Sequence, residues 1–434
     1  MNYEYEKAVE YVLQIPRFTK KNTPEATRSF YEYLGCPGER ARIIHVAGTN
    51  GKGSVCSYIN AVLIRAGIRT ALFTSPHLVD IRERIRVDGK MISRQDFAHT
   101  LNRCLEELER FRQTEGNGEY HPTFFEILFF LGMLWFEEKG VEAIVLETGL
   151  GGRLDATNVI SAPAVCVITR IGLDHMEYLG NTKAEIAGEK AGIIKKGVPV
   201  VFWEQEAEVN RVIVEKTEQL GAQAVCVSEK DVLFFNFDNK TVDFSLRSEY
   251  YGYVRVCLHT LAIYQKENAA LSVRALEALG HLYEPVLSRK MIEEGLASAK
   301  WEGRMDEVMP GVVIDGAHNE DGVRVFLESV RADGCCGKRF LLFSVVSDKR
   351  AEQMAAQILE SGLFSRIVVA ENESSRSRAG GQVVSLFKGQ AVLYESPEEA
   401  FRFLIEEKQE TDRVYATGSL YLAGQLLDWL ENEN

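Results

Sequence analysis

The most constraining feature of the sequence is a glycine-rich stretch that directly follows a short apolar run. Residues 43–54 read Ile-Ile-His-Val-Ala-Gly-Thr-Asn-Gly-Lys-Gly-Ser, and an amphipathic helical pattern comes next. A strand, a glycine loop with a lysine, and a helix form the arrangement that binds phosphate, because amides and the lysine face the anion. The stretch therefore predicts a phosphate-binding loop made of Gly48, Thr49, Asn50, Gly51, Lys52, Gly53 and Ser54.

The loop departs from the usual pattern at the position after its lysine. Gly53 stands where a serine or threonine normally provides a hydroxyl for the magnesium ion that accompanies ATP. The glycine expected five residues before Gly51 is also missing. Another side chain must supply the hydroxyl, so the ends of the neighbouring strands become the place to look for it.

Short apolar runs alternate with helical patterns along almost the whole chain. This alternation predicts an α/β fold with mostly parallel sheets covered on both faces. A chain of 434 residues can hold two domains, and we place their boundary near 298–301. Residues 225–257 alternate aromatic and polar side chains, which predicts antiparallel hairpins. We expect strands at 43–47, 69–74, 142–147, 164–169, 198–202, 311–315, 339–345, 366–370, 391–394 and 413–417, and helices at 123–138, 184–192, 267–279 and 321–331.

The bulk composition narrows the classes of partner. A formal net charge of −13 argues against non-specific nucleic-acid binding, which needs a basic surface. It is compatible with small anionic ligands, because a few local cations and amides bind them. No apolar run is long enough to cross a bilayer, the first residues do not resemble a signal segment, and the eight cysteines form no C-x-x-C pair. We expect a cytoplasmic monomer with reduced thiols and no membrane partner.

Polar side chains follow three of the expected strands at the point where each strand ends. Ser75 follows the second strand, Glu147 closes the third, and His175 follows the fourth. Because ligands bind beyond the carboxyl ends of parallel strands, these side chains should lie beside the phosphate loop. A hydroxyl and a carboxylate suit magnesium, and Ser75 can replace the hydroxyl that Gly53 lacks. The alternatives are a turn cap for Ser75, a solvated strand end for Glu147 and an ordinary loop histidine for His175.

Three further charged residues stand out less clearly. Lys190 lies in a helical pattern that is apolar on one face, where a lysine is more often a solvated charge. Asp315 closes a buried strand in the second half of the chain, and Arg304 lies just upstream of it. Both could reach a nucleotide from the side opposite the loop, whereas the alternative for Arg304 is a salt bridge between domains. The residues alone leave both interpretations open.

Together these motifs resemble the folylpolyglutamate synthase/dihydrofolate synthase family, part of the Mur ligase superfamily. The phosphate loop and the stretch at 146–158 are the most specific matches. The resemblance spans nearly the whole chain. In the family's order, the matching stretches are HVAGTNGKGS (45–54), TSPHL (74–78), ERI (83–85), TFFE (123–126), LETGLGGRLDATN (146–158), GLDHMEYLG (172–180), EKAGIIK (189–195), QKENAALS (265–272), DGAHN (315–319) and GSLYLAG (418–424).

The resemblance implies a P-loop ATPase-like domain at 1–298 and a smaller Rossmann-like domain at 299–434, with the active site between them. It implies ATP and Mg²⁺ as cofactors, and it makes Lys190 a carbamylated lysine that binds a second metal ion. The implied site comprises metal ligands at Ser75, Glu147, His175 and Lys190; nucleotide contacts at the loop residues 48–54, Asn268, Arg304 and Asp315; catalytic groups at Lys52, Lys190 and His318; and contacts to the pteroate end of the substrate at Thr123, Phe124, Phe125, Glu126, Leu154, Asp155 and Ala156.

The chain departs from the family pattern at several positions. Tyr264 stands where a histidine is usual, Glu302 and Glu320 stand where prolines are common, and Arg350 stands where an aspartate is frequent. None of these changes removes an expected phosphate or metal ligand.

The implied reaction is ATP-dependent amide formation between L-glutamate and the carboxylate of a folate or dihydropteroate. The γ-phosphoryl group would activate the carboxylate as an acyl phosphate, which the glutamate amine then attacks. The candidate acceptors are dihydropteroate, a tetrahydrofolate polyglutamate, or both. A Mur-type peptidoglycan ligase is one alternative, although we expect no room for its extra domain ahead of Gly48. A P-loop nucleotide-switch protein is the other, although the hydroxyl usual after its lysine is missing.

Overall fold

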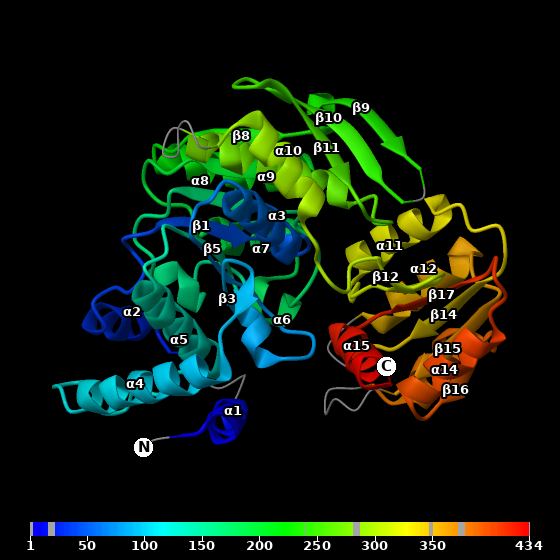
Figure 1. Cartoon of the computed structure of the whole chain (residues 1–434), viewed down its shortest axis with the longest axis horizontal. Helices are drawn as coiled ribbons and strands as arrows, with labels where there is room; N and C mark the ends of the chain where they lie inside the picture. The colour runs from blue at the N-terminus through cyan, green and yellow to red at the C-terminus, as the bar shows by residue number, and fades with distance from the viewer. Residues whose placement is uncertain are drawn as a thin grey trace.

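The computed structural model describes residues 3–15, 22–238, 240–280, 287–346, 350–371 and 378–433. Figure 1 shows two parts: a larger one, coloured blue to green, and a smaller one, coloured yellow to red. The larger part holds an eight-stranded and a three-stranded sheet, and the smaller part holds a six-stranded sheet. Within these ranges, no helix combines the length and the apolar character that crossing a membrane requires.

The eight-stranded sheet is mostly parallel and has β1 near its centre. Its order is β4-β3-β2-β5-β1-β6-β7-β8, and only the pairs β2–β3 and β3–β4 are antiparallel. The five strands that the sequence predicts in this part are confirmed to within two residues. The strands are β1 (Arg42–Ala47), β2 (Thr70–Phe73), β3 (Ile85–Val87), β4 (Lys90–Met91), β5 (Ala143–Glu147), β6 (Val165–Ile168), β7 (Val200–Trp203) and β8 (Ala224–Val227).

Helices cover both faces of this sheet, as the continuous apolar strands require. One face packs against α3, α9 and α10. The other face packs against two groups of helices, α4 with α5 and α7 with α8. The helices of this part are α1 (Tyr5–Gln14), α2 (Pro24–Tyr33), α3 (Lys52–Arg65), α4 (Arg94–Arg112), α5 (Phe124–Lys139), α6 (Met176–Leu179), α7 (Lys183–Ala191), α8 (Ala207–Gln219), α9 (Gln265–Gly280) and α10 (Arg289–Ser298), with 3₁₀ turns η1 (Ile81–Arg84), η2 (Ala156–Val159) and η3 (Glu229–Asp231).

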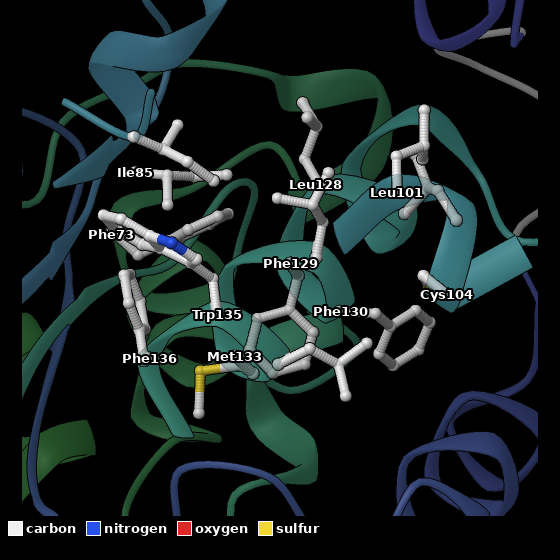
Figure 2. Packing of buried hydrophobic residues seen from close by; sticks show 14 of the residues in the cluster. Phe73, Ile85, Leu101, Cys104, Leu128, Phe129, Phe130, Met133, Trp135 and Phe136 are labelled. Atoms are coloured by element: carbon white, nitrogen blue, oxygen red, sulfur yellow. The ribbon is translucent and has the colours of Figure 1, made fainter. Parts of the chain in front are cut away.

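Helix α5 is the most buried of these helices, and its N-terminus reaches the pocket described below. It is apolar almost all round, which is typical of a helix enclosed by other elements. Thr123 caps it with a capping box that includes Glu126. Its core partners come from α4, β2 and β3. Figure 2 shows this packing around Phe73, Ile85, Leu101, Cys104, Leu128, Phe129, Phe130, Met133, Trp135 and Phe136.

Only part of the segment predicted to form antiparallel hairpins does form them. Strands β9 (Val232–Phe237), β10 (Val242–Ser248) and β11 (Gly252–Leu258) form the expected antiparallel sheet. The prediction is wrong for its first residues, because β8 pairs in parallel with β7 and extends the large sheet. An alternating pattern does not distinguish an edge strand of a parallel sheet from a hairpin strand.

The six-stranded sheet has the order β12-β13-β17-β14-β15-β16 and is parallel except for its edge strand β12. Helices α11 to α13 cover one face, and α14 and α15 cover the other. The predicted strands of this part are confirmed, whereas β12 was not predicted. The elements are β12 (Asp306–Met309), β13 (Val312–Ile314), α11 (Glu320–Ala332), β14 (Arg339–Phe343), α12 (Ala351–Ser361), β15 (Arg366–Ala370), α13 (Gly380–Leu386), β16 (Ala391–Tyr394), α14 (Pro397–Glu407), β17 (Arg413–Thr417) and α15 (Leu420–Glu433).

Candidate active site

The predicted phosphate loop lies between β1 and α3, and its glycines pack tightly against their neighbours. Helix α3 begins at Lys52, and Gly51 precedes it in the left-handed conformation, with φ at 91°. A Cβ atom at Gly51 would lie 2.2 Å from Oδ1 of Asn268, and one at Gly48 would lie 1.8 Å from Oγ1 of Thr169. Both positions therefore require glycine, and the loop backbone can approach a bound anion.

The unusual glycine after the lysine packs against an indole ring. A Cβ atom at Gly53 would lie 2.7 Å from Cζ2 of Trp301, which follows α10 on the way to the six-stranded sheet. The same junction contacts α3 again, because the Ser57 hydroxyl donates to the Lys300 carbonyl at 3.1 Å. A serine or threonine at position 53 would clash with the ring. The ring of Trp301 therefore leaves no space for a side-chain hydroxyl at position 53 in the first turn of α3.

The three candidate metal ligands lie at the strand ends where the sequence predicts them. The Ser75 N–H donates to Oε2 of Glu147 at 3.1 Å, and Oε1 of Glu147 lies 4.0 Å from Nζ of Lys52. Glu147 is buried, so it is not the solvated strand end of the alternative interpretation. His175 has a positive φ of 50° at the start of α6, and its Nε2 lies 3.9 Å from Oδ1 of Asp174.

The chemistry of this corner suits a divalent cation bound together with phosphate oxygens. Burial raises the pKa of Glu147, which means that its carboxylate lacks full charge compensation from the protein. The carboxylates, histidines and cysteines of the described part of the chain form no group of three or more that could hold a metal by themselves. A site that uses the Ser75 hydroxyl and ligand oxygens is consistent with that finding. Oxygen donors are what magnesium prefers.

Lys190 is buried rather than solvated, so the solvated-charge alternative is wrong. Its ammonium group donates to the Gly48 carbonyl at 2.7 Å, which places it directly under the phosphate loop. Burial lowers the pKa of Lys190 to about 7, and the nearby Lys52 lowers it further, while Asp174 and Asp155 oppose the change. The amine is therefore poised to be neutral near physiological pH.

The C-terminal part contributes Asp315 and Arg304 to the same pocket. The Asp315 carboxylate accepts hydrogen bonds from the N–H groups of Met305 and Ala317 and from the Tyr264 hydroxyl, at 2.7 to 2.8 Å. The Arg304 guanidinium donates to the Gly303 carbonyl at 2.9 Å and forms no ion pair with any described residue. The alternative of a salt bridge for Arg304 therefore finds no support within the described ranges.

A polar network joins the phosphate loop to the N-terminus of α11. The side-chain amides of Asn50 and Asn319 exchange two hydrogen bonds of 3.0 Å each, and Asn319 also donates to Asp174. His318 lies beside this network, with Nε2 3.6 Å from the Asp174 carboxylate and Nδ1 2.8 Å from the Gly316 carbonyl. The contacts hold the loop and the six-stranded sheet together across the pocket.

The residues expected at the pteroate end of the substrate line another part of the same pocket, which we call the acceptor side. The Glu126 carboxylate accepts hydrogen bonds from Asn22, from Thr27 and from the Thr123 N–H. The Asp155 carboxylate accepts from the Leu150 N–H at 2.8 Å and caps η2. These carboxylates are held rigidly by the chain itself.

All the candidate site residues named from the sequence line one pocket of about 590 Å³. The pocket extends from the carboxyl ends of the central strands to the six-stranded sheet. It is lined by the predicted phosphate-loop residues 48–54, by Ser75, Glu147, His175 and Lys190, by Asn268, Arg304, Asp315 and His318, and by Thr123, Phe124, Phe125, Glu126, Leu154, Asp155 and Ala156.

Several lining residues have no signal in the sequence. Asn22 and Thr27 reach the pocket from the region of α2, and Arg170 pairs with Glu267 at 2.6 Å beside the loop. Their partners lie about a hundred positions away along the chain, beyond the reach of any local pattern. Tyr264 also lines the pocket, and from the sequence it is noted only as a departure from the family pattern.

Comparison with known proteins finds two family matches along the chain. Residues 46–275 match the Mur ligase middle domain, and residues 303–420 match the Mur ligase glutamate ligase domain. The dihydrofolate synthase/folylpolyglutamate synthase of Bacillus subtilis (strain 168) is 35% identical over 405 residues, which cover 91% of each chain. The chain belongs to the folylpolyglutamate synthase/dihydrofolate synthase family. The resemblance inferred from the motifs is thereby confirmed.

Other members of the family agree in sequence and in fold. The folylpolyglutamate synthase of Lacticaseibacillus casei is 30% identical over 444 residues, which cover 96% of this chain and 97% of that one. The structure of E. coli FolC in complex with DHPP and ADP has a TM-score of 0.88 at 25% identity, covering 99% of this chain and 98% of that one. These matches confirm the predicted α/β fold class.

Two departures from the folylpolyglutamate synthase pattern contact each other. Glu320, in the first turn of α11, forms an ion pair of 2.6 Å with Arg350, which precedes α12. A third departure, Tyr264, donates to Asp315 at 2.7 Å. Both contacts leave the expected phosphate and metal ligands in place.

Proposed function

We propose that the chain is an ATP-dependent ligase that joins L-glutamate to the carboxylate of a pteroate or folate compound. The observation that carries this proposal is a single pocket that is lined both by the phosphate loop and by residues 123–126 and 154–156. Relatives named dihydrofolate synthase/folylpolyglutamate synthase, and a FolC structure with DHPP and ADP, support the same activity.

ATP would bind with its phosphates on residues 48–54 and on the amino end of α3. Lys52 lies at that end and would offset the charge that develops on the transferring phosphoryl group. Magnesium held by Ser75, Glu147 and His175 would neutralise charge on the phosphate oxygens. Asn268, which packs against Gly51, would contact the rest of the nucleotide together with Arg304 and Asp315.

The reaction needs no nucleophilic side chain. A carboxylate oxygen of the acceptor attacks the γ-phosphorus, the bond to ADP breaks, and an acyl phosphate forms. The glutamate amine then attacks the acyl carbon, loses a proton, and inorganic phosphate leaves. The protein orients these groups and excludes water, with His318 on the phosphate side. Residues 299–434 would close on residues 1–298 to assemble the site.

Lys190 would contribute as a carbamate. A neutral buried amine can attack CO₂ and release a proton, which turns a cation into an anion able to bind a second metal ion. The pKa of about 7 provides the neutral amine that this step requires. The position of Lys190 under Gly48 places the resulting anion next to the phosphate loop.

The test is an assay of ADP release that depends on both ATP and L-glutamate. Dihydropteroate and tetrahydrofolate are compared as acceptors, with a peptidoglycan precursor as the acceptor of the Mur-type alternative. Turnover with either pteroate compound supports the proposal and identifies the acceptor. Turnover with the peptidoglycan precursor alone, or a rate of ATP hydrolysis that no acceptor changes, would overturn the proposal. A cytoplasmic monomer without nucleic-acid partners stays a prediction.

A further inference from the structure

A fully buried histidine lies behind the acceptor side of the pocket. His45 is in the middle of β1 and is 0% exposed. Successive side chains of a strand alternate between its faces, so His45 shares the face of Ile43, which belongs to the apolar core beneath α5. An apolar side chain would fill this position without a polar atom to satisfy. The histidine therefore needs an explanation other than packing.

The hydrogen bonds of His45 determine its tautomer. Its Nε2 lies 2.8 Å from the Thr157 hydroxyl, and that hydroxyl donates to Oδ1 of Asp155 at 2.6 Å. An ionised carboxylate only accepts, so the single hydroxyl proton goes to Asp155 and His45 must donate through Nε2. Nδ1 is then a bare acceptor, and it is indeed buried without a hydrogen-bond partner. Burial lowers the pKa of His45 to about 3, so the ring stays neutral.

The chain of donors ends on a carboxylate that lines the pocket. Oδ1 of Asp155 also accepts from the Thr157 N–H at 3.0 Å, and Oδ2 accepts from the Leu150 N–H at 2.8 Å. His45 thus completes a directed series of hydrogen bonds that runs from the core to Asp155. Such a series fixes a side chain before the ligand arrives, and neighbouring hydrogen bonds strengthen one another.

We infer that His45 is a positioning residue that acts through Thr157 to orient the Asp155 carboxylate toward the pteroate end of the acceptor. This inference rests on the proposed function. Because the ring proton is on Nε2, Nδ1 has no hydrogen-bond partner, and the protein tolerates this unsatisfied atom. His45 itself does not touch the substrate, because the hydroxyl of Thr157 lies between them.

The test compares His45→Leu, His45→Gln and Thr157→Val in the full chain. Leucine and valine remove one link each, whereas the amide of glutamine can still donate to Thr157. We expect His45→Leu and Thr157→Val each to raise the KM for the pteroate acceptor about tenfold, with KM for ATP within about twofold of wild type. The double variant should be no worse than either single one, because both act through one carboxylate. His45→Gln should restore most of the affinity.

Thermal unfolding separates this role from a purely structural one. His45→Leu should keep or raise the melting temperature, since it removes an unsatisfied polar atom, and the exposed His99→Leu serves as the matched control. Equal losses of stability in the leucine and glutamine variants, with both KM values unchanged, would overturn the positioning role. A wild-type protein without acceptor-dependent turnover would instead overturn the proposed function, which distinguishes the two failures.

Discussion

At the phosphate-loop side of the pocket, ionisable groups are buried with little compensation from the protein, whereas at the acceptor side the carboxylates are surrounded by donors. Glu147 has one cation at 4.0 Å and a raised pKa, and Lys190 has a pKa lowered to about 7. Glu126 and Asp155, by contrast, accept hydrogen bonds from side chains and backbone N–H groups of the chain itself.

The difference shows how one pocket can serve two kinds of ligand. The phosphate-loop side is electrostatically incomplete in the protein alone, and under the proposed function nucleotide phosphates and metal ions would supply the charges that it lacks. The carboxylates of the acceptor side already have their hydrogen-bond donors, so under the proposed function this side would offer a fixed shape to a heterocyclic ring. Substitutions at the first side should therefore change chemistry more than stability. Substitutions at the second side should change stability and acceptor affinity.

The largest expected effect comes from Lys52→Ala. Loss of the cation at the start of α3 should reduce kcat by roughly a thousandfold or more, because charge on the transferring phosphoryl group is no longer offset. Steady-state ADP release measures the effect, and Lys90→Ala, at an exposed lysine, is the control. Turnover near that of wild type would remove Lys52 from the site.

Glu147→Gln should lower turnover at a fixed magnesium concentration by about 10²- to 10³-fold. The amide keeps the shape but loses the charge, and the melting temperature should stay or rise, since burial disfavours the carboxylate. A magnesium titration of the rate, with Glu138→Gln as the control, is the measurement. An unchanged magnesium dependence would contradict a ligand role.

Lys190→Ala should reduce activity by about a hundredfold, and small carboxylates such as formate or acetate should restore part of it. The added anion would take the place of the proposed carbamate under the loop. Rates with and without the carboxylate measure the rescue, and Lys52→Ala, which should not respond, is the matched control. A fully active alanine variant would end the carbamate proposal.

Glu126→Gln tests the acceptor side. In the glutamine variant an NH2 group replaces one carboxylate oxygen, and this donor would face other hydrogen-bond donors. The free energy of unfolding should therefore fall by about 1–3 kcal/mol. KM for the acceptor should rise a few-fold, while KM for ATP stays constant. Denaturant unfolding and steady-state kinetics give both values. A loss in the free energy of ATP binding that is larger than the loss in the free energy of unfolding would contradict the distinction between the phosphate-loop side and the acceptor side.

The stability of the chain should also depend on pH. The pKa of Lys190 is about 7 in the folded chain and 10.5 in the reference state, so the unfolded chain binds more protons between these values. The free energy of unfolding should therefore rise with pH in this window because of Lys190. Lys190→Met should flatten the rise relative to wild type. Identical pH profiles in chemical denaturation would contradict the buried, neutral amine.

The functional residues at the strand ends can be predicted from the sequence, whereas the side chains that pack against them cannot. Ser75 and Glu147 follow from the rule that ligands bind beyond the carboxyl ends of parallel strands, and their contact at 3.1 Å agrees with it. The glycine at position 53 was recognisable as unusual, but its cause, the ring of Trp301, lies 248 positions further along the chain. Such contacts depend on tertiary packing, which no local pattern encodes.

The buried lysine shows the same limit. Local periodicity favoured a solvated Lys190, and only the resemblance to the family gave it a role. Its burial depends on the loop that folds over it, since Gly48 accepts its hydrogen bond from 142 positions away. The pairs Tyr264–Asp315 and Glu320–Arg350 arise in the same way, from elements that meet only in the folded chain.

If the acceptor carboxylate and the nucleotide meet in this pocket, an acyl phosphate forms before the amide. The most direct test uses an acceptor whose carboxylate carries ¹⁸O, incubated with ATP and L-glutamate, with mass analysis of the phosphate released. We expect one ¹⁸O atom in each released phosphate for every amide formed. Amide formation with unlabelled phosphate would contradict it.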